Sequence, residues 1–322
     1  MEKMKAVICT KYGAPEVLQI KEVEKPIPKD NEVRIKIHAT AVTASDIFIR
    51  SSNIPLRFRI PMRIMVGIRK PRCSMSIIGL VFSGVIDSVG KNIKRFKQGD
   101  CVYGMGGFEF GAYAEYKCMK ETDSKKGCIA LKPKNISYEE ATAAAYGGLL
   151  AFQQIEKVNI QEKQRVLIYG ASGNSGTLAI QVAKHLGAEV TAICGTSNIN
   201  MVKELGADHV LDYTKQDRLP KDMQYDFILD TAGIYKISKL KNACKKALSP
   251  TGKYASIDDG ALQLDSNRLN RIKEYIEAGY IKPVIDRCYP LEKIVEAHKY
   301  VEKGHKKGGV AITIFKQLII KE

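Results

Sequence analysis

The sequence lacks any apolar run close to the ~20 residues that a helix needs to cross a bilayer. Residues 1–5 also lack the long apolar segment of a secretory signal. We therefore expect a cytoplasmic protein with no membrane partner. Paired cysteines are missing too, because the eight cysteines are scattered and form no Cys-x-x-Cys motif. In a chain of 322 residues, this pattern favours reduced thiols over a disulfide scaffold.

Histidines are scarce, and the motifs of hydrolytic enzymes are missing. The chain has five histidines, and none pairs with a cysteine at the spacing of a zinc finger. His185 and His298 fall on predicted helices, where a packing or surface role is favoured over a metal site. The sequence shows no hydrolytic nucleophile motif and no phosphate-transfer lysine. Hydride transfer needs neither of them, because its cofactor carries the chemistry.

Acidic residues are few relative to basic ones. The chain has 51 lysines and arginines against 35 aspartates and glutamates, which gives a net charge of +16. Such a balance raises the question of nucleic-acid or membrane binding. The lysines are spread along the chain and form no stripe, so a nucleic-acid partner is not favoured. The alternative is a basic solvated surface that also attracts a phosphorylated cofactor.

The hydrophobic pattern divides the chain into three stretches. Residues 1 to about 125 contain short alternating or apolar runs broken by Gly, Pro, Asn and Asp, which is typical of strands. From about 126 to 266, short strands alternate with helices, which favours βαβ units and a parallel sheet. The last stretch contains two further helices and two further strands. A β-rich head, an α/β middle and a returning tail indicate a first domain that is discontinuous in sequence.

The expected elements follow from these patterns. In the head, we expect strands at 33–39, 84–89 and 112–117. In the middle, we expect strands at 165–169, 189–194, 209–212, 225–230 and 253–257, and helices at 177–186, 198–205 and near 237–248. The helix at 198–205 would have Ser197 as its N-cap. In the tail, we expect helices at 267–278 and 291–302, and strands at 283–287 and 310–315.

A glycine-rich turn joins the strand at 165–169 to the helix that follows. Spaced glycines let the chain turn tightly and bring backbone N–H groups close to an anion, while the helix N-terminus presents its positive dipole end. The strand, turn and helix context predicts a bound nicotinamide dinucleotide, with a purely structural turn as the alternative. The expected cofactor-binding residues of the turn are Gly170, Ala171, Ser172, Gly173, Asn174, Ser175 and Gly176.

The end of the second strand indicates which dinucleotide is bound. Sites for NAD usually carry an Asp or Glu there, which binds the ribose 2′-hydroxyl. This chain has Thr196, Ser197 and Asn198 after the strand and no acid. The missing carboxylate removes the charge that would repel a 2′-phosphate, and the polar side chains can bind that phosphate. No arginine stands in the turn, yet the pattern favours NADPH over NADH.

Taken together, the motifs resemble the medium-chain dehydrogenase/reductase superfamily, and within it the zinc-free quinone oxidoreductase (zeta-crystallin-like) branch. The similarity covers nearly the whole chain. Besides the glycine turn, it rests on GAPEVL at 13–18, AVTASD at 41–46, GAYAEY at 111–116, LGADHVLDY at 205–213 and YDFILD at 225–230.

The resemblance implies an α/β fold in which a Rossmann domain is inserted in a β-rich GroES-like domain. The GroES-like catalytic domain would consist of residues 1–125 plus 280–322, and the Rossmann NADP-binding domain of residues 126–279. The cofactor would lie between the two domains. The implied activity is NADPH-dependent reduction of quinones, enones or related conjugated carbonyls. Tyr213 matches a family tyrosine that stacks near the adenosine 2′-phosphate.

The resemblance also bears on metal and catalysis. The metal ligands of zinc-bearing relatives fall at Thr43 and Leu80 here, and the structural zinc loop is missing, so no metal is expected. Many relatives have Asn at the Thr43 position, Tyr at the Phe48 position and Thr at the Leu150 position. Thr43 is therefore the only side chain that we expect to stabilise charge on a substrate oxygen, and a packing role at the strand end is the alternative. Asp46 is expected to cap a helix rather than to act as a general acid.

The segment near 258–267 is several tens of residues shorter than in relatives. The missing part usually supplies strands of the dimer interface, which calls a homodimer into question. Two alternatives to the reductase remain. One is an NADPH-binding protein with weak or no turnover, such as a sensor or an RNA-binding accessory protein. The other, disfavoured by Thr43 and Leu80, is a zinc-type alcohol dehydrogenase.

Overall fold

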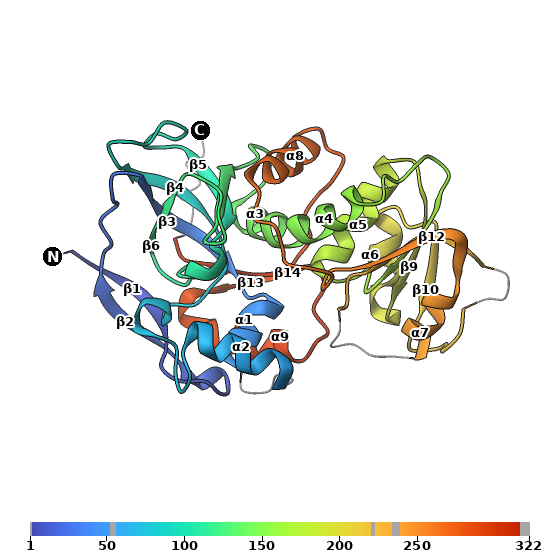
Figure 1. Cartoon of the computed structure of the whole chain (residues 1–322), viewed down its shortest axis with the longest axis horizontal. Helices are drawn as coiled ribbons and strands as arrows, with labels where there is room; N and C mark the ends of the chain where they lie inside the picture. Colours follow the sequence, from blue (N-terminus) through green and yellow to red (C-terminus); the bar gives the residue numbers. More distant parts are fainter. Residues whose placement is uncertain (1, 52–55, 220–222, 234–238, 316–322) are drawn as a thin grey trace.

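The computed structural model describes residues 2–51, 56–219, 223–233 and 239–315. A β-rich part and a parallel sheet flanked by helices lie side by side along the longest axis of the molecule (Figure 1). Across the described ranges, no helix has the length and apolar character needed to cross a membrane. All eight cysteines are free thiols.

The β-rich part is built on a sheet of seven strands in the order β13-β14-β3-β4-β5-β7, with β6 paired to β3. All neighbours are antiparallel except β13 and β14. A separate antiparallel hairpin joins β1 (Lys3–Cys9) to β2 (Leu18–Glu24). The strands of the large sheet are β3 (Glu32–Ala41), β4 (Val81–Val89), β5 (Cys101–Met105), β6 (Tyr116–Lys120), β7 (Cys128–Leu131), β13 (Ile285–Pro290) and β14 (Gly309–Thr313).

The alternation seen in the sequence explains strand β3. Val33, Ile35 and Ile37 are fully buried, while the residues between them are partly exposed. This period of two turns one face of the strand toward the core. The strand expected at 112–117 is largely wrong, because β6 begins only at Tyr116.

The other part contains a parallel sheet of five strands in the order β10-β9-β8-β11-β12. The three inner strands, β8, β9 and β11, are mostly apolar and buried, as expected where helices cover both faces of a parallel sheet. The strands are β8 (Arg165–Tyr169), β9 (Glu189–Cys194), β10 (His209–Asp212), β11 (Tyr225–Asp230) and β12 (Leu248–Ser256). The helices of this stretch are α3 (Tyr138–Ala143), α4 (Leu149–Glu156), α5 (Asn174–His185), α6 (Ile199–Glu204), α7 (Lys239–Lys246) and α8 (Ser266–Glu277).

In sequence order, this sheet reads 3-2-1-4-5, which is the dinucleotide-binding order without its sixth strand. After β12, the chain runs through residues 257–265 directly into α8, so β12 forms an edge of the sheet. Among the residues that the structure describes, no sixth strand extends this sheet beyond β12.

Several expected element boundaries need correction. The helix expected at 177–186 begins at Asn174, because Gly173 rather than a later residue is its N-cap. Ser197 does not cap the next helix; it lies inside a 3-10 turn that precedes α6, and Asn198 is the N-cap position. The helix expected near 237–248 is described from Lys239 onward, and its first two expected residues lie outside the described ranges.

The tail returns to the β-rich part. Helix α9 (Ile294–Glu302) follows a 3-10 turn at Leu291–Lys293, so the helix expected at 291–302 begins with that turn. It packs near α1 (Ala44–Arg50), the first helix of the head. Strand β14 lies between β13 and β3, which confirms that head and tail build one sheet (Figure 1).

Candidate active site

The glycine-rich turn lies at the carboxyl end of β8, the central strand of the parallel sheet, and leads into α5. Gly170 has a φ of +79°, a left-handed conformation that favours glycine. A Cβ on Gly176 would come within 2.5 Å of the carbonyl oxygen of Gly170. Gly173 is the N-cap of α5, so the N–H groups of the first helical turn have no acceptor within the helix. The turn therefore offers backbone donors to an anion.

The remaining turn residues differ in what they can contribute. Ala171 is buried, and its N–H donates to the Ile193 carbonyl at 3.0 Å, so it supports the turn from the core side. Ser172 is half-buried, and its carbonyl accepts from the Gly308 N–H at 2.9 Å. Ser175 is buried in the first turn of α5. The tail thus contacts the glycine turn directly, a contact that the sequence reasoning did not find.

Asn174 has an unsatisfied polar atom. Its side chain is buried, its Nδ2 donates to the Ala143 carbonyl at 3.1 Å, and its Oδ1 has no partner. A π-helical turn, Ala144–Gly148, packs against this residue, and a Cβ on Gly147 would lie 2.8 Å from the Asn174 Cγ. Turns of this type are frequent at functional sites. The free Oδ1 is an acceptor for a hydroxyl or amide of a bound ligand.

The turn lies where the strand order reverses. β9 and β11 flank β8 on opposite sides, and ligands of such sheets bind at the carboxyl ends of the strands at this point. Thr231, just after β11, donates from its hydroxyl to the carbonyl oxygens of Tyr169 and Gly170, at 2.8 and 3.0 Å. This contact holds the rim of the crevice in place.

The end of β9 carries the residues expected near the 2′-phosphate. Thr196 and Ser197 are exposed, whereas Asn198 is buried with its Oδ1 unpartnered. Tyr213 is 45% exposed, and its N–H donates to the Cys194 carbonyl at 3.1 Å. The four expected residues therefore lie around one strand end.

An acid that the sequence reasoning did not consider also lies there. The carboxylate of Asp212, at the end of β10, accepts from the hydroxyl of Thr196 and from the N–H and hydroxyl of Thr214, at 2.9 and 2.7 Å. Burial would raise the pKa of Asp212, but these hydrogen bonds and the charge of Lys215 lower it below its ordinary value. The carboxylate is thus engaged by neighbours, and a cation stands beside it.

These features fit a dinucleotide. Glycines hold the cradle where a Cβ would clash, donors of a helix N-terminus face it, and two buried amide oxygens, on Asn174 and Asn198, have no partner. A pyrophosphate accepts hydrogen bonds from such N–H groups, and ribose hydroxyls can donate to the amide oxygens.

Thr43, the catalytic candidate, is the N-cap of α1. Its hydroxyl donates to Asp46 Oδ2 at 2.6 Å and accepts from the Asp46 N–H at 3.2 Å, which completes a capping box. Asp46 therefore caps the helix, as expected. The hydroxyl hydrogen of Thr43 already has an acceptor, so a substrate oxygen must compete with a carboxylate for it. Burial raises the pKa of Asp46 to about 7.

Tyr146 is a functional candidate that the sequence reasoning missed. It lies on the π-helical turn, and its hydroxyl is 2.9 Å from the Ser45 Oγ on α1. It therefore bridges the stretch that leads into the parallel sheet and the helix capped by Thr43. Burial raises the pKa of Tyr146, so the phenol keeps its proton at neutral pH. Its signal in the sequence was weak, because a tyrosine in an alanine- and glycine-rich run also fits core packing.

The other altered positions are apolar. Leu80 is buried directly before β4, and Leu150 is buried on α4, while Phe48 is partly buried on α1. Among the residues that the structure describes, no group of three or more His, Cys, Asp or Glu side chains could hold a metal ion. The resemblance places the zinc ligands of zinc-bearing relatives at Thr43 and Leu80, and neither side chain is a usual zinc ligand.

A buried cluster behind the site joins head and tail. Arg50, at the end of α1, is fully buried and donates from Nε to His298 Nδ1 at 3.2 Å, and it pairs with Glu302. The other ring nitrogen of His298 is 3.2 Å from the Tyr113 hydroxyl. Burial and the Arg50 charge lower the pKa of His298 to about 3. His298 is thus a neutral packing residue, as expected.

Comparisons with known proteins identify the family and the relatives of the chain. Residues 29–132 match the alcohol dehydrogenase GroES-like domain, and residues 176–272 and 260–312 match zinc-binding dehydrogenase families. The chain is 31% identical to 2-methylene-furan-3-one reductase of Solanum lycopersicum, over 96% of this chain and 79% of that protein. It is 27% identical to quinone oxidoreductase of Homo sapiens, over 97% and 98%.

Among solved structures, a quinone oxidoreductase from Coxiella burnetii has the same fold, with a TM-score of 0.83 and 23% identity over 98% of this chain and 100% of that one. The fold and the relatives define an oxidoreductase with a nicotinamide cofactor, built from a Rossmann-like sheet and a GroES-like domain. The chain belongs to the medium-chain dehydrogenase/reductase superfamily, with quinone oxidoreductases and enone reductases among its relatives.

Proposed function

We propose that the chain is an NADPH-dependent reductase that transfers hydride to a quinone, an enone or a related conjugated carbonyl, without zinc. The observation that carries the proposal is the position of the glycine turn. It lies at the point where the strand order reverses, and the adjoining π-helical turn reaches the hydroxyl groups on α1. The names of the relatives supply the substrate class.

Bound NADPH would supply the hydride. Negative charge then develops on the carbonyl oxygen of the substrate and needs hydrogen-bond donors. Ser45 and Tyr146 share one hydrogen bond, and the Tyr146 phenol also lies close to the Thr43 side chain. The proposal assigns the remaining hydroxyl hydrogen of the Ser45 and Tyr146 pair to that oxygen. The phenol is the more acidic of the two and the better donor. Thr43 is a second donor once its bond to Asp46 Oδ2 is released, and solvent supplies the proton.

The preference for NADPH rests on the residues at the end of β9. Ser197 is exposed there, with no acid after the strand to meet a ribose 2′-hydroxyl. Lys215 adds a positive charge, and the nearby carboxylate of Asp212 is engaged by two threonines. A 2′-phosphate would therefore meet hydroxyls and a cation.

We also propose that residues 1–125 and 280–322 form the catalytic domain and residues 126–279 the cofactor domain.

The experiment is to mix the purified protein with NADPH and a panel of quinones and enones, and to follow the loss of reduced cofactor. We expect turnover with at least one member, a smaller rate with NADH, and no change after treatment with a zinc chelator. Absence of turnover across the panel contradicts the proposal, and loss of activity upon chelation contradicts its zinc-free part.

A second candidate is an NADPH-binding protein with weak or no turnover. It is favoured by one observation, namely that the hydroxyl of Thr43 is held by Asp46, while Phe48 and Leu150 are apolar. This candidate predicts that NADPH changes the protein's tyrosine fluorescence or raises its melting temperature although no substrate in the panel is reduced.

A further inference from the structure

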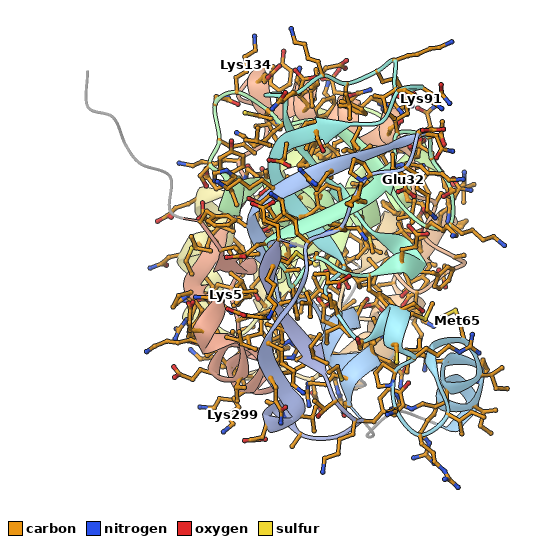
Figure 2. The ribbon with its side chains drawn as sticks, turned by 90° about the vertical axis from the view of Figure 1, so that its left-hand side faces the viewer. Lys5, Glu32, Met65, Lys91, Lys134 and Lys299 are labelled. Atoms are coloured by element: carbon orange, nitrogen blue, oxygen red, sulfur yellow. The ribbon has the colours of Figure 1, made fainter. Side chains whose placement is uncertain are left out.

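One surface of the head combines dense positive charge with exposed aliphatic side chains. Between Asp46 and Asp87, the chain contains seven arginines and lysines and no acidic residue. Helix α2 (Leu56–Val66) and the turn after it lie within this run. Figure 2 shows them at the edge of the molecule, near the labelled Met65.

Three isoleucines of this segment are exposed to solvent. Ile60, Ile64 and Ile68 have exposed fractions of 53, 62 and 78%. Ile60 and Ile64 are four residues apart on α2 and therefore share one face, and Ile68 follows on the turn. Exposed aliphatic side chains in such a row are costly in water, so a contiguous set points to an apolar contact.

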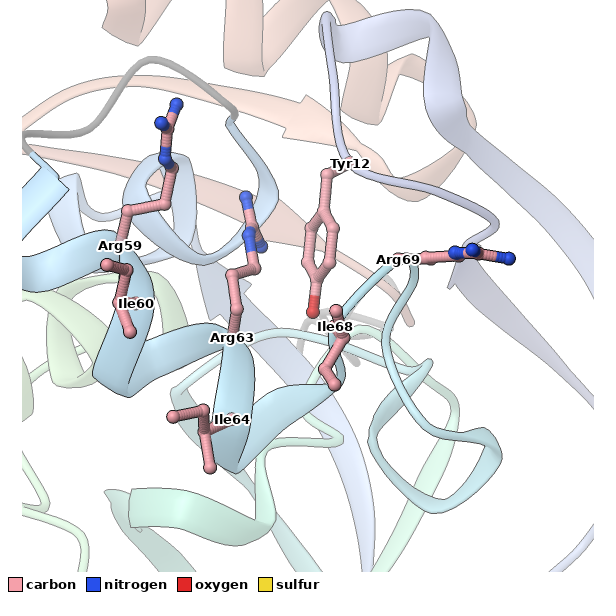
Figure 3. Close-up of a pocket in the computed structure, with 7 residues that line it drawn as sticks. All are labelled: Tyr12, Arg59, Ile60, Arg63, Ile64, Ile68 and Arg69. Carbon is pink, nitrogen blue, oxygen red and sulfur yellow. The ribbon is translucent and has the colours of Figure 1, made fainter.

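Basic side chains lie around these isoleucines. Arg59 and Arg69 line the same open pocket as the three isoleucines, together with Arg63 and Tyr12 (Figure 3). Within the described part of the chain, no salt bridge joins Arg69 or Lys70 to an acid.

Arg63 has a different role. It donates to the carbonyl oxygens of Ile49 and Ser51, at 3.2 and 2.7 Å, and covers the ring of Tyr12. These contacts fix α2 to the carboxyl end of α1, the helix that Thr43 caps. The surface is therefore anchored to the fold and lies one short helix from the candidate site.

We propose that this surface, defined by Ile60, Ile64, Ile68, Arg69 and Lys70, binds to the face of an anionic phospholipid bilayer. The phosphate of a phospholipid can pair with the basic side chains, and its hydrocarbon can pack against the isoleucines, so a phospholipid binds both the basic and the aliphatic parts of the surface. A nucleic acid would use only the cations. The expectation of no membrane partner rested on the lack of spanning segments, and binding to a bilayer surface needs no spanning helix.

The test is sedimentation of the full chain with two kinds of vesicle, phosphatidylcholine alone and an equimolar mixture with phosphatidylserine. We expect binding only to the mixture, weakening as salt screens the charges. The variants Ile64→Ser with Ile68→Ser, and Arg69→Gln with Lys70→Gln, should each weaken partitioning about tenfold or more. These side chains are exposed, so the unfolding midpoint should stay unchanged.

Matched controls lie elsewhere on the head. Ile27 is 77% exposed, and Lys94 and Lys97 are exposed, so Ile27→Ser and Lys94→Gln with Lys97→Gln change the same chemistry outside the surface. They should bind like the parent chain. The proposal is overturned if the chain binds both kinds of vesicle equally, or if the control variants lose as much binding as the test variants. It is also overturned if the chain binds polyglutamate as well as it binds the mixed vesicles and Ile64→Ser with Ile68→Ser leaves that binding unchanged. These outcomes are independent of turnover.

Discussion

At the scale of single residues, the hydroxyl groups at the start of α1 are not equivalent. The hydroxyl of Thr43 donates its hydrogen to the carboxylate of Asp46, whereas the hydroxyls of Ser45 and Tyr146 share one hydrogen bond. The family resemblance leads us to expect a tyrosine at the position of Phe48, and Tyr146 brings a phenol to the same helix from a different element. We infer that the phenol function has moved rather than disappeared.

Replacing Tyr146 by phenylalanine tests this directly. Because the variant loses only a donor to the developing oxyanion, we expect kcat to fall about a hundredfold with little change in KM. The affinity for NADPH, measured by fluorescence titration, should stay the same. Introducing Phe48→Tyr into Tyr146→Phe should recover part of the rate. A variant as fast as the parent chain would show that the hydroxyl takes no part in the reaction.

The choice of cofactor depends on Ser197. Ser197→Asp places a carboxylate at the end of β9, where it can accept from a ribose 2′-hydroxyl and repel a 2′-phosphate. We expect the ratio of the dissociation constants for NADPH and NADH to shift about tenfold or more toward NADH, since a charged contact is worth about 1.5–3 kcal/mol. Ser197→Asn, which adds no charge, is the matched control. An unchanged ratio would place the 2′-phosphate elsewhere.

At the scale of elements, the strand, turn and helix from β8 to α5 depend on two glycines for different reasons. Gly170 adopts a left-handed φ, and Gly176 permits close contact with the Gly170 carbonyl. Gly176→Ala should lower the free energy of unfolding by about 1–3 kcal/mol and weaken NADPH binding, because its Cβ forces the turn apart. Chemical denaturation and cofactor titration measure both.

Gly173 provides the control for that substitution. It has no left-handed φ, and a Cβ there would meet the Gly170 oxygen only at 3.3 Å. Gly173→Ala should therefore cost less stability than Gly176→Ala. The reverse order would show that the close contact between Gly176 and Gly170 does not set the shape of the turn.

Sequence reasoning worked best for elements that local patterns specify. The buried strand, the glycines and the helix of the cofactor turn follow one another in the chain, so consecutive residues were enough to predict them. The π-helical turn Ala144–Gly148 was not, because its shape depends on packing against Asn174, which is distant in sequence. The expected cap at Ser197 failed for a related reason, since a 3-10 turn occupies that position.

At the scale of the whole molecule, the discontinuous sheet of head and tail could be predicted from the returning tail and the family resemblance. The pairing of Arg50 with His298 and Glu302 could not, because nothing local links residues so far apart in the sequence. The hydrogen bond between Gly308 and Ser172 could not be predicted from the sequence for the same reason. Long-range polar contacts depend on the assembled fold.

The buried cluster predicts a pH dependence of stability. The pKa of His298 falls from 6.5 to about 3 on folding, so the unfolded chain binds a proton that the folded chain does not. Stability is therefore lost as the pH drops from 6.5 toward 3, by up to about 1.4 kcal/mol per pH unit. Asp46, with a raised pKa, has the opposite effect as the pH rises toward 7.

The variant His298→Gln isolates the histidine contribution. Urea unfolding at a series of pH values should give a stability difference between parent and variant that shrinks as the pH falls below 6.5. The variant lacks the titrating ring but retains polar atoms for Arg50 and Tyr113. A difference that is constant with pH would mean that His298 is not held neutral by the fold.

The place of β14 in the sheet has a consequence for synthesis of the protein. Residues Ala311, Ile312 and Thr313 pair with Ala41, Thr40 and Ala39, directly before the Thr43 cap. A ribosome has finished all five strands of the parallel sheet before it reaches residue 309. A nascent chain can thus form its parallel sheet while strand β3 still lacks its neighbour β14. A chain that ends before residue 309 would then bind the cofactor next to an incomplete catalytic part.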